Sequence, residues 1–313
     1  MTILIGLSSL PFLNELIADK EGNLYGWVPD LNVQKLLTDS NGSILGYSKY
    51  RVFLYFLFIH LYGFIAFLGW YTVAKNKYYR PAILLCALSA AYHVGVVLFN
   101  QRMTDFNDFR FKLVGTIVLA VVLFALYYRK KKKENGYLEH THTLFGTRPK
   151  KILTFKVVLV WLLLIMVSTL FYYHDIITLR VGGIKDWVPN LGIEELLTNS
   201  NGDVWGFGSY RAFILTLFLQ LFAQIGWAGW LHDSYGSLYR PFLIAPLGLS
   251  LYQVILLLTE STGTPLNRPD IKLMLVLAIG TVLCILFFFR NKGLQGYNTD
   301  KKILAQNNNN SKN

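Results

Sequence analysis

The sequence predicts an all-α, polytopic integral membrane protein made of two tandem, parallel four-helix transmembrane repeats. Apolar residues make up 53% of the 313 residues and gather in long runs, and the mean hydropathy is +0.39. Soluble domains rarely have this composition. A long stretch of the sequence also recurs in the second half of the chain, and the basic residues cluster at the ends of the apolar runs, as they do in membrane proteins.

The duplication runs without a gap, at a constant offset of 160 in residue number. Residues 27–31 read Trp-Val-Pro-Asp-Leu, and residues 187–191 read Trp-Val-Pro-Asn-Leu. The same offset relates the following pairs: Leu36–Gly42 and Leu196–Gly202, Tyr50-Arg51 and Tyr210-Arg211, and Tyr79-Arg80-Pro81 and Tyr239-Arg240-Pro241. We therefore expect two copies of one membrane unit joined head to tail.

The first copy begins with residues 1–13, which are apolar but shorter than the roughly 20 residues of a usual span. Under the offset they align with the interior of the apolar run 153–173, so we expect a short or partial first helix. Residues 14–50 follow as a polar loop rich in turn-forming Gly, Asn and Asp. Within it, the stretch after Pro29 predicts a short amphipathic helix lying at the membrane interface.

The remaining apolar runs predict seven full spans, at about 52–73, 81–100, 113–128, 153–173, 212–231, 241–259 and 273–289. They divide the chain into a first repeat (1–128), a basic linker (129–151), a second repeat (152–292) and a tail (293–313). The tail ends in a run of Asn, a low-complexity composition that favours disorder.

Basic residues set the expected orientation. Lys75, Lys77 and Arg80, the basic linker 129–151 and Arg240 all fall on one side of the predicted spans. The positive-inside rule makes that side cytoplasmic, together with the C-terminus. With four spans in each copy, both copies insert the same way up and are parallel repeats. We expect the protein in the cell membrane, inner or plasma.

Five polar side chains inside the predicted spans are candidates for a substrate pathway. His60 aligns with Gln220 and His93 with Gln253, while Gln224 lies one helical turn beyond Gln220. Polar groups are costly in hydrocarbon and often mark a function. They predict a polar seam between the two halves, where histidine can also carry protons. The alternative is that they serve only as hydrogen bonds between helices.

A second set of polar residues lies at the outer ends of the spans and predicts contacts with an anion or a lipid headgroup. The set is Arg51, Arg211, Lys112, Lys272, Asn107 and Asn267. Packed around a common axis, the four cations would line one outer vestibule, with Asp105, Asp108 and Asp270 neutralising part of the charge. The alternative is that these long side chains reach the membrane interface and anchor the helices.

Signals of enzyme chemistry are absent from the sequence. There is no P-loop, dinucleotide fingerprint, zinc-protease helix or nucleophile elbow, and no carboxylate lies mid-span. Cys86 and Cys284 occupy non-equivalent positions in apolar runs, so we expect two buried thiols rather than a disulfide. No cofactor or metal is predicted. Membrane topology explains the net charge of +12 without a nucleic-acid partner.

The function that these patterns favour is movement of a small solute, anion or lipid through the polar seam. A second hypothesis is a non-catalytic membrane subunit or assembly factor that holds a partner through its outer loops, with Trp27, Trp187 and Trp205 as contacts. A membrane enzyme acting on lipid-linked groups is a third. The expected partners are the lipid bilayer and either a membrane protein or further copies of the chain. In layout alone, one copy resembles four-span DoxX-like bacterial membrane proteins, and no residue role carries over.

Overall fold

In a computed structural model, the chain is all-helical over the residues that the structure describes. These are residues 2–29, 32–40, 42–99, 107–145, 154–179, 183–189, 195, 197–198, 204, 207–259 and 264–310, with side chains up to Lys133 and Phe289 in the two longest helices. Six helices are long and apolar enough to cross a membrane, or seven if one bent pair is a single span. Their length and composition are those of a multi-span membrane protein.

The helices run in the following order. The first half of the chain holds α1 (Thr2–Leu7), η1 (Leu10–Phe12), α2 (Leu13–Ile17), α3 (Val33–Leu37), α4 (Tyr50–Val73), α5 (Arg80–Leu98) and α6 (Phe109–Phe145). The second half holds α7 (Phe155–Ser168), α8 (Leu170–Ile177), α10 (Tyr210–Asp233), η4 (Arg240–Leu243), α11 (Ile244–Leu258), η6 (Pro265–Asn267) and α12 (Pro269–Asn310).

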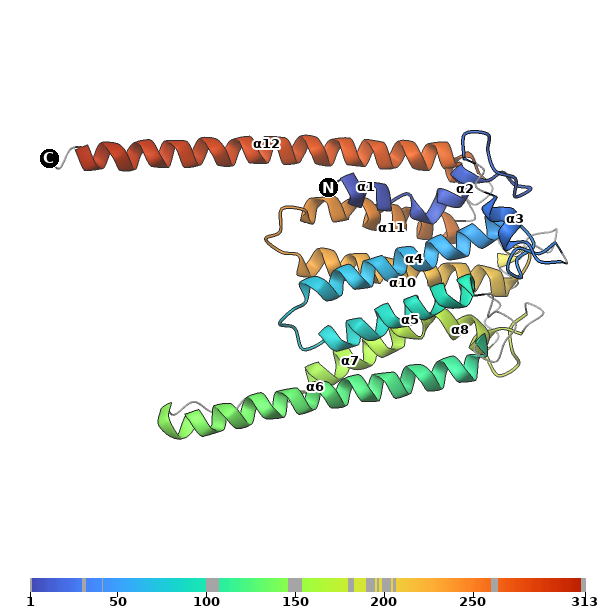
Figure 1. The fold of residues 1–313 in the computed structure, drawn as a ribbon, viewed down its shortest axis with the longest axis horizontal. Coiled ribbons are helices and arrows are strands. Elements are labelled where there is room, and N and C mark those ends of the chain that lie inside the picture. The colour runs from blue at the N-terminus through green and yellow to red at the C-terminus, as the bar shows by residue number, and fades with distance from the viewer. Residues whose placement is uncertain are drawn as a thin grey trace.

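The long helices lie roughly side by side, with α4 and α10 in the middle (Figure 1). We call the end where α4 and α10 begin the loop face, and the end where they finish the tail face. On one side of this central pair, α5 packs against α7 and α6; on the other, α11 packs against α1 and α12. Each outer group thus combines helices from both halves of the chain, because α7 joins α5 and α6, and α1 joins α11 and α12.

The predicted spans agree with the helices except at the start of the second half. There the sequence predicts one span over 153–173, and the structure breaks it into α7 and α8, bent by 65°. Ser168 and Thr169 cause this locally, because their hydroxyls donate to the carbonyls of Ile165 (2.7 Å) and Met166 (2.7 Å). Such bonds to the preceding turn compete with the helix ladder and bend it.

The first helix is divided in a similar way. Between α1 and η1, the Ser8 hydroxyl donates to the carbonyl of Leu4 (3.1 Å) and the Ser9 hydroxyl to that of Gly6 (2.7 Å). The segment Thr2–Ile17 is apolar but shorter than the other spans. Under the offset, Ser8 and Ser9 align with Ser168 and Thr169, so the two breaks fall at equivalent positions.

Two predictions about the helix ends differ from the structure. Both α6 and α12 continue past the membrane segment, into the basic linker as far as Phe145 and through the tail as far as Asn310. Extending an existing helix needs no new nucleation, so a segment whose composition predicts a linker or a disordered tail can still continue it.

The prediction of two buried thiols was wrong for Cys284, which is exposed on α12, whereas Cys86 is buried.

The loops are closed by short turns that recur along the chain. Isolated antiparallel bridges join Ala18 to Leu24 and Thr38 to Ile44, and equivalent bridges join Thr178 to Ile184 and Thr198 to Val204. Gly22 (φ +98°) and Gly42 (φ +77°) supply the positive φ that the turn chemistry predicts. In the first turn, backbone hydrogen bonds from Asn23 and Gly22 to its carboxylate lower the pKa of Asp19. The helix predicted after Pro29 is α3, five residues long.

An apolar core fills the middle and the tail half of the bundle. Trp227, Tyr62, Phe67 and Phe222 are fully buried between α4 and α10, and the Phe67 and Phe222 rings lie 4.4 Å apart. Small residues let the two helices approach closely: a Cβ added to Gly69 would enter the ring of Trp230, and one added to Gly229 would enter the ring of Trp70. Close packing of this kind substitutes for hydrophobic drive between helices inside a bilayer.

At the tail face, Asp233 joins α10 to α4 and to the residue that precedes α5. Its carboxylate, 1% exposed, accepts hydrogen bonds from Trp70 Nε1 (2.7 Å) and the Tyr79 hydroxyl (2.8 Å). Burial and the nearby Asp233 raise the pKa of Tyr79. Below the ordinary tyrosine pKa near 10 the hydroxyl is protonated and its hydrogen bond contributes fully to the free energy of unfolding. This contribution is lost as the pH rises through the raised pKa of Tyr79.

We expect Asp233→Ala to lower the free energy of unfolding by about 2–4 kcal/mol, because two partly buried donors lose a charged acceptor. Asp233→Asn should lose less, since its amide oxygen still accepts one of these bonds. Steric trapping of the unfolded protein in bicelles measures the free energy of unfolding of both variants. Equal stability of Asp233→Ala and the wild type would show that Trp70 and Tyr79 do not depend on this carboxylate.

Candidate functional site

A buried ion cluster lies at the loop face around Glu15 of α2. Its carboxylate binds Lys272 of α12 through both oxygens (3.0 and 3.1 Å) and lies 4.0 Å from Arg51 of α4. The Lys272 side chain is only 2% exposed, and its ammonium lies over the ring of Phe12. A buried ammonium needs such a partner, because desolvation otherwise opposes its charge. Glu15 thus ties α2, α4 and α12 together.

A second ion cluster surrounds Asp175 of α8. Its carboxylate contacts Arg211 of α10 in a close hydrogen-bonded pair and lies 3.7 Å from Lys112 of α6. The Lys112 ammonium lies over the ring of Tyr172, and His174 Nε2 lies 3.4 Å from the same carboxylate.

The two ion clusters are related by the offset of 160. It takes Glu15 to Asp175, Arg51 to Arg211 and Lys112 to Lys272. Each cluster therefore has one arginine and one lysine around a single carboxylate. The offset relates the lysine of one cluster to the lysine of the other.

The single vestibule predicted from the four cations is replaced by these two clusters. Lys112 is on α6 and Lys272 on α12, the helices at opposite edges of the bundle (Figure 1). Glu15 and Asp175 were not among the predicted residues, although they are themselves separated by the offset of 160, a signal that could have found them.

Of the acidic residues expected to neutralise the cations, Asp108 interacts electrostatically with Lys112. Asp108 accepts a hydrogen bond from the backbone of Arg110 (2.7 Å) at the start of α6, and Asp270 pairs with Arg268 (2.9 Å). Asp105 lies outside the described residues. Asn107 and Asn267 are half-buried, just before α6 and in η6.

Three buried histidines, His60, His93 and His174, interact with one another next to the Asp175 cluster, and we call them the histidine cluster. The rings of His60 and His93 stack at 5.6 Å, and Phe171 stacks on both, at 5.5 and 4.4 Å. In the first two rings Nδ1–H donates to the carbonyl four residues earlier, that of Phe56 (2.6 Å) or Ser89 (2.8 Å). This fixes Nε2 as the free acceptor, and in His93 that atom is buried without a partner.

The positions equivalent to the histidine cluster under the offset hold amides: Gln220, Gln253 and Asn14. We call these three residues the amide set, and all three are buried. Gln220 Oε1, Gln253 Nε2 and Asn14 Oδ1 have no hydrogen-bond partner, and neither has His174 Nδ1. The Ser250 hydroxyl contacts the backbone carbonyl of Gln220, and Tyr55 lies close to the Gln220 side chain.

The predicted seam residues therefore fall on two sides of the central helix pair. His60 and His93 meet between α4 and α5, whereas Gln253 lies on α11, across α4 and α10 (Figure 1). Gln224, one turn beyond Gln220 on α10, is half-buried. Buried polar atoms are nearly always hydrogen-bonded. The unpaired atoms of the histidine cluster and the amide set are therefore sites where a bound water molecule or ligand would supply the missing hydrogen bonds.

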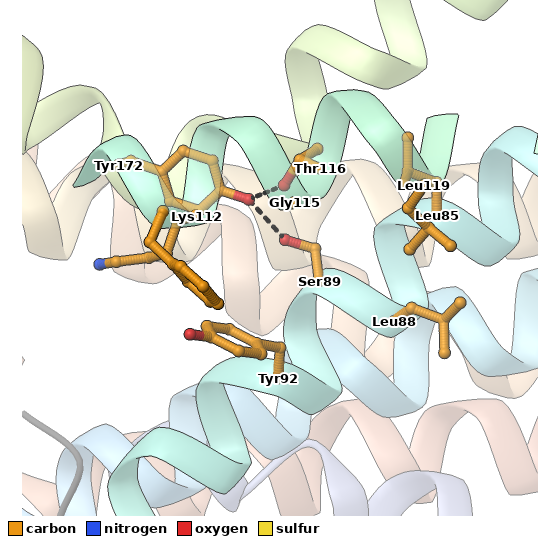
Figure 2. Close-up of a pocket in the computed structure, with 10 residues that line it drawn as sticks. Leu85, Leu88, Ser89, Tyr92, Lys112, Gly115, Thr116, Leu119 and Tyr172 are labelled. Carbon is orange, nitrogen blue, oxygen red and sulfur yellow. Dashed lines mark hydrogen bonds between the residues drawn. The ribbon is translucent and has the colours of Figure 1, made fainter. Parts of the chain in front are cut away.

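One cavity, of about 260 Å³, lies between α5, α6 and α8. Figure 2 shows Tyr172 at its wall, with its hydroxyl bonded to Thr116 (2.5 Å) and in contact with Ser89 (3.3 Å). Lys112 lies near Tyr172 and Tyr92, while Leu85, Leu88 and Leu119 lie toward the other end. The cavity is thus amphipathic, with its polar end next to the Asp175 cluster.

A second cavity, of about 390 Å³, opens at the loop face. Lys20, Lys49 and Arg51 line it together with Val52, Tyr55 and Asn14. We call it the basic pocket. Its lining joins the Glu15 cluster, through Arg51, to the amide set, through Asn14.

Among the residues that the structure describes, no three His, Cys, Asp or Glu side chains gather as a set that could hold a metal ion. Comparison with known proteins finds no match: neither a family model, nor a curated protein, nor a solved structure resembles the chain.

Proposed function

We propose that the chain is a carrier that moves a small solute, anion or lipid across the membrane, built from two tandem parallel four-helix repeats (residues 1–128 and 152–292). Contacts that recur under the offset support the duplication. Besides the ion clusters, Arg80 Nε donates to the carbonyl of Tyr71 (3.3 Å) and Arg240 Nε to that of Leu231 (3.2 Å). Carriers are often duplicated bundles with polar sites near the repeat interface.

The observation that carries the proposal is the set of unpaired polar atoms in the histidine cluster and the amide set. Those of His93, Gln220 and Gln253 lie within helices apolar enough to span a membrane, where an unpaired polar atom costs several kcal/mol. These unpaired atoms bring a cost and no benefit to a protein that only spans the membrane. A polar ligand that binds to them on its way through the bundle would explain why they are present. The proposed pathway includes polar groups on both sides of the central helix pair: His60 and His93 on one side, Gln253 on the other, and Gln220 and Gln224 on α10 itself.

The tail half of the bundle supports a carrier rather than an open channel. Between the polar groups and the tail face, Trp227 and Trp230 stack at 5.3 Å and Phe67 packs on Phe222 at 4.4 Å. This aromatic packing closes the path toward the tail face, so a ligand entering from the loop face stops at the polar groups.

The side of entry follows from the charges at the two faces. Lys75, Lys77 and Arg80 lie at the tail face, which we propose as cytoplasmic, with the linker 129–151 and the tail 293–313. The loop face is then the outer side of the cell membrane, and the ligand reaches the polar groups from outside.

Transport in proteoliposomes tests the proposal, with two probes: radiolabelled inorganic phosphate, and a fluorescent phosphatidylglycerol whose exposure is read by dithionite quenching. We expect the wild type to move at least one probe and the His60→Leu/Gln220→Leu variant to lose at least nine-tenths of that rate while remaining folded. The matched control, Leu68→Ala/Ala228→Leu, changes two exposed positions on the same helices. An active His60→Leu/Gln220→Leu variant would contradict the pathway.

One observation favours the second candidate, a membrane subunit that holds a partner. Trp27 and Trp187 are 67% and 64% exposed in the loops, and large exposed aromatics often serve as interface anchors. Trp205 lies outside the described residues. Native mass spectrometry of the protein, extracted gently from its own membrane, separates the two candidates: a fixed-ratio protein partner favours the subunit, whereas a monomer or homo-oligomer carrying a small molecule or lipid favours the carrier.

A further inference from the structure

We infer that the basic pocket is a binding site for a phosphate group, carried either by a lipid headgroup or by a small phosphate-bearing solute. The inference deepens the proposed function. Transport of the bound ligand rests on that proposal, whereas binding to the pocket does not. Three cationic side chains converge on one cavity of about 390 Å³, from the loop after α2 (Lys20), from the residue before α4 (Lys49) and from its first turn (Arg51).

Arg51 is available for such a ligand because Glu15 is already occupied. Lys272 takes both carboxylate oxygens at 3.0 and 3.1 Å, whereas the closest approach of Arg51 is 4.0 Å. A guanidinium that is not engaged in a hydrogen-bonded pair keeps its planar fork of donors free, the geometry that suits phosphate oxygens. Its side chain is one-quarter exposed, so it is reachable yet partly desolvated.

The Asp175 cluster shows the contrast. There Arg211, the equivalent of Arg51, makes the close contact with the carboxylate, and the lysine, Lys112, is the more distant partner. The positions equivalent to Lys49 and Tyr55 hold Ser209 and Leu215, which bring neither a positive charge nor a phenol. In the described part of the chain, Lys20 and Lys49 thus line a cavity beside Arg51, whereas Arg211 is engaged with Asp175, although the two arginines share the sequence context Tyr-Arg.

The depth of the pocket adds a second, independent feature. Asn14, 4% exposed, lines the pocket, and its side-chain oxygen has no partner. Asparagine presents both donors and an acceptor, so its buried amide can bond a protonated phosphate oxygen or a neighbouring hydroxyl of the ligand. Lys49 is held only loosely, by the carbonyl of Lys20 (3.1 Å) and by Glu21 at 3.9 Å, in an exposed pair.

The position of the pocket and its size favour phosphate over a bare inorganic anion such as chloride. It opens beside the start of α4, a helix long and apolar enough to span a membrane, and the end of such a helix lies near the lipid headgroups. Its volume exceeds that of one phosphate, and is within the range of sites that hold a small organic molecule. A phosphate with an attached glycerol or similar group would reach from the lysines to Asn14.

The test is equilibrium binding to the full chain with two probes. Radiolabelled inorganic phosphate is titrated onto protein in phosphatidylcholine nanodiscs, and retained phosphatidylglycerol is counted by native mass spectrometry from mixed nanodiscs. We expect saturable binding of at least one probe, reduced at least tenfold by Arg51→Gln and by Lys20→Ala/Lys49→Ala. Because both lysines lie at the surface, the second variant guards against a folding defect in the first. Arg268→Gln removes one exposed charge and should bind normally.

The outcomes assign the source of the phosphate or overturn the inference. Loss of phosphate binding in Arg51→Gln indicates a soluble ligand, and loss of phosphatidylglycerol alone indicates a headgroup. Absence of both signals in the wild type, or no change in either variant, overturns the inference. A wild type that binds but moves neither probe contradicts the proposed carrier alone, whereas transport of a phosphate probe at an unchanged rate in Arg51→Gln contradicts the pocket alone.

Discussion

Glu15→Gln should lower the free energy of unfolding by about 3 kcal/mol. The change keeps the shape of the side chain but removes the only negative charge that contacts Lys272 in the described structure, leaving an ammonium that is 2% exposed. Breaking one partner of a buried ion pair typically costs about 3–5 kcal/mol, since the remaining charge stays desolvated. The amide oxygen of glutamine can still accept one hydrogen bond, which places the expected cost at the lower end.

A rescue experiment separates the charge effect from general damage at this position. Lys272→Met in the Glu15→Gln background removes the stranded cation, and replacing both members of a buried pair by uncharged groups is often close to neutral. The double variant should therefore recover most of the lost stability. Steric trapping in bicelles measures the three values on one scale.

The exposed pair at the start of α12 provides the matched control. Arg268 and Asp270 have side chains that are 66% and 47% exposed, and surface pairs contribute between zero and about 1 kcal/mol. Asp270→Asn should thus change stability little. If Glu15→Gln loses no more than Asp270→Asn, the Lys272 ammonium does not depend on its carboxylate.

The parts of the fold that follow from local pattern could be predicted from the sequence. Six spans agree with helices because a run of about 20 apolar residues has few other solutions in a membrane. The break between α7 and α8 was missed, since Ser168 and Thr169 are ordinary residues within an apolar run. The structure shows the 65° bend there together with the hydroxyls that bond back to the preceding turn, and neither can be seen in the sequence.

Partners across the bundle were harder to predict than the residues themselves. Position along the sequence identified the four cations, Arg51, Arg211, Lys112 and Lys272, but not the carboxylates that pair with them. For the two lysines, the carboxylate lies on a helix from the other half of the chain. Such pairing depends on which helices are neighbours, and a single sequence does not contain that information. The offset of 160 that joins Glu15 to Asp175 was available, yet both residues follow an apolar run and read as the start of a polar loop.

The two close approaches between α4 and α10 yield the last prediction. Gly69→Ala places a methyl group inside the ring of Trp230, and Gly229→Ala places one inside the ring of Trp70. Overpacking a filled core costs about 1–3 kcal/mol, more than the roughly 1 kcal/mol that alanine gains over glycine in a helix. Gly248→Ala in α11 is the matched control, because open space surrounds that position and stability there should stay equal or rise.

The two glycines should not be equally sensitive, and the difference tests how the aromatic core is held. Trp70 is fixed by its hydrogen bond to Asp233, so it cannot turn away from a methyl group at position 229 without losing that bond. Trp230 has a buried Nε1 with no partner, so its indole can shift at lower cost. We expect Gly229→Ala to lose more stability than Gly69→Ala, and Asp233→Ala, which removes the acceptor of the Trp70 bond, to narrow the gap between them. Equal losses in both variants would mean that the Asp233 bond does not hold Trp70 in place, and that packing alone decides the distance between α4 and α10.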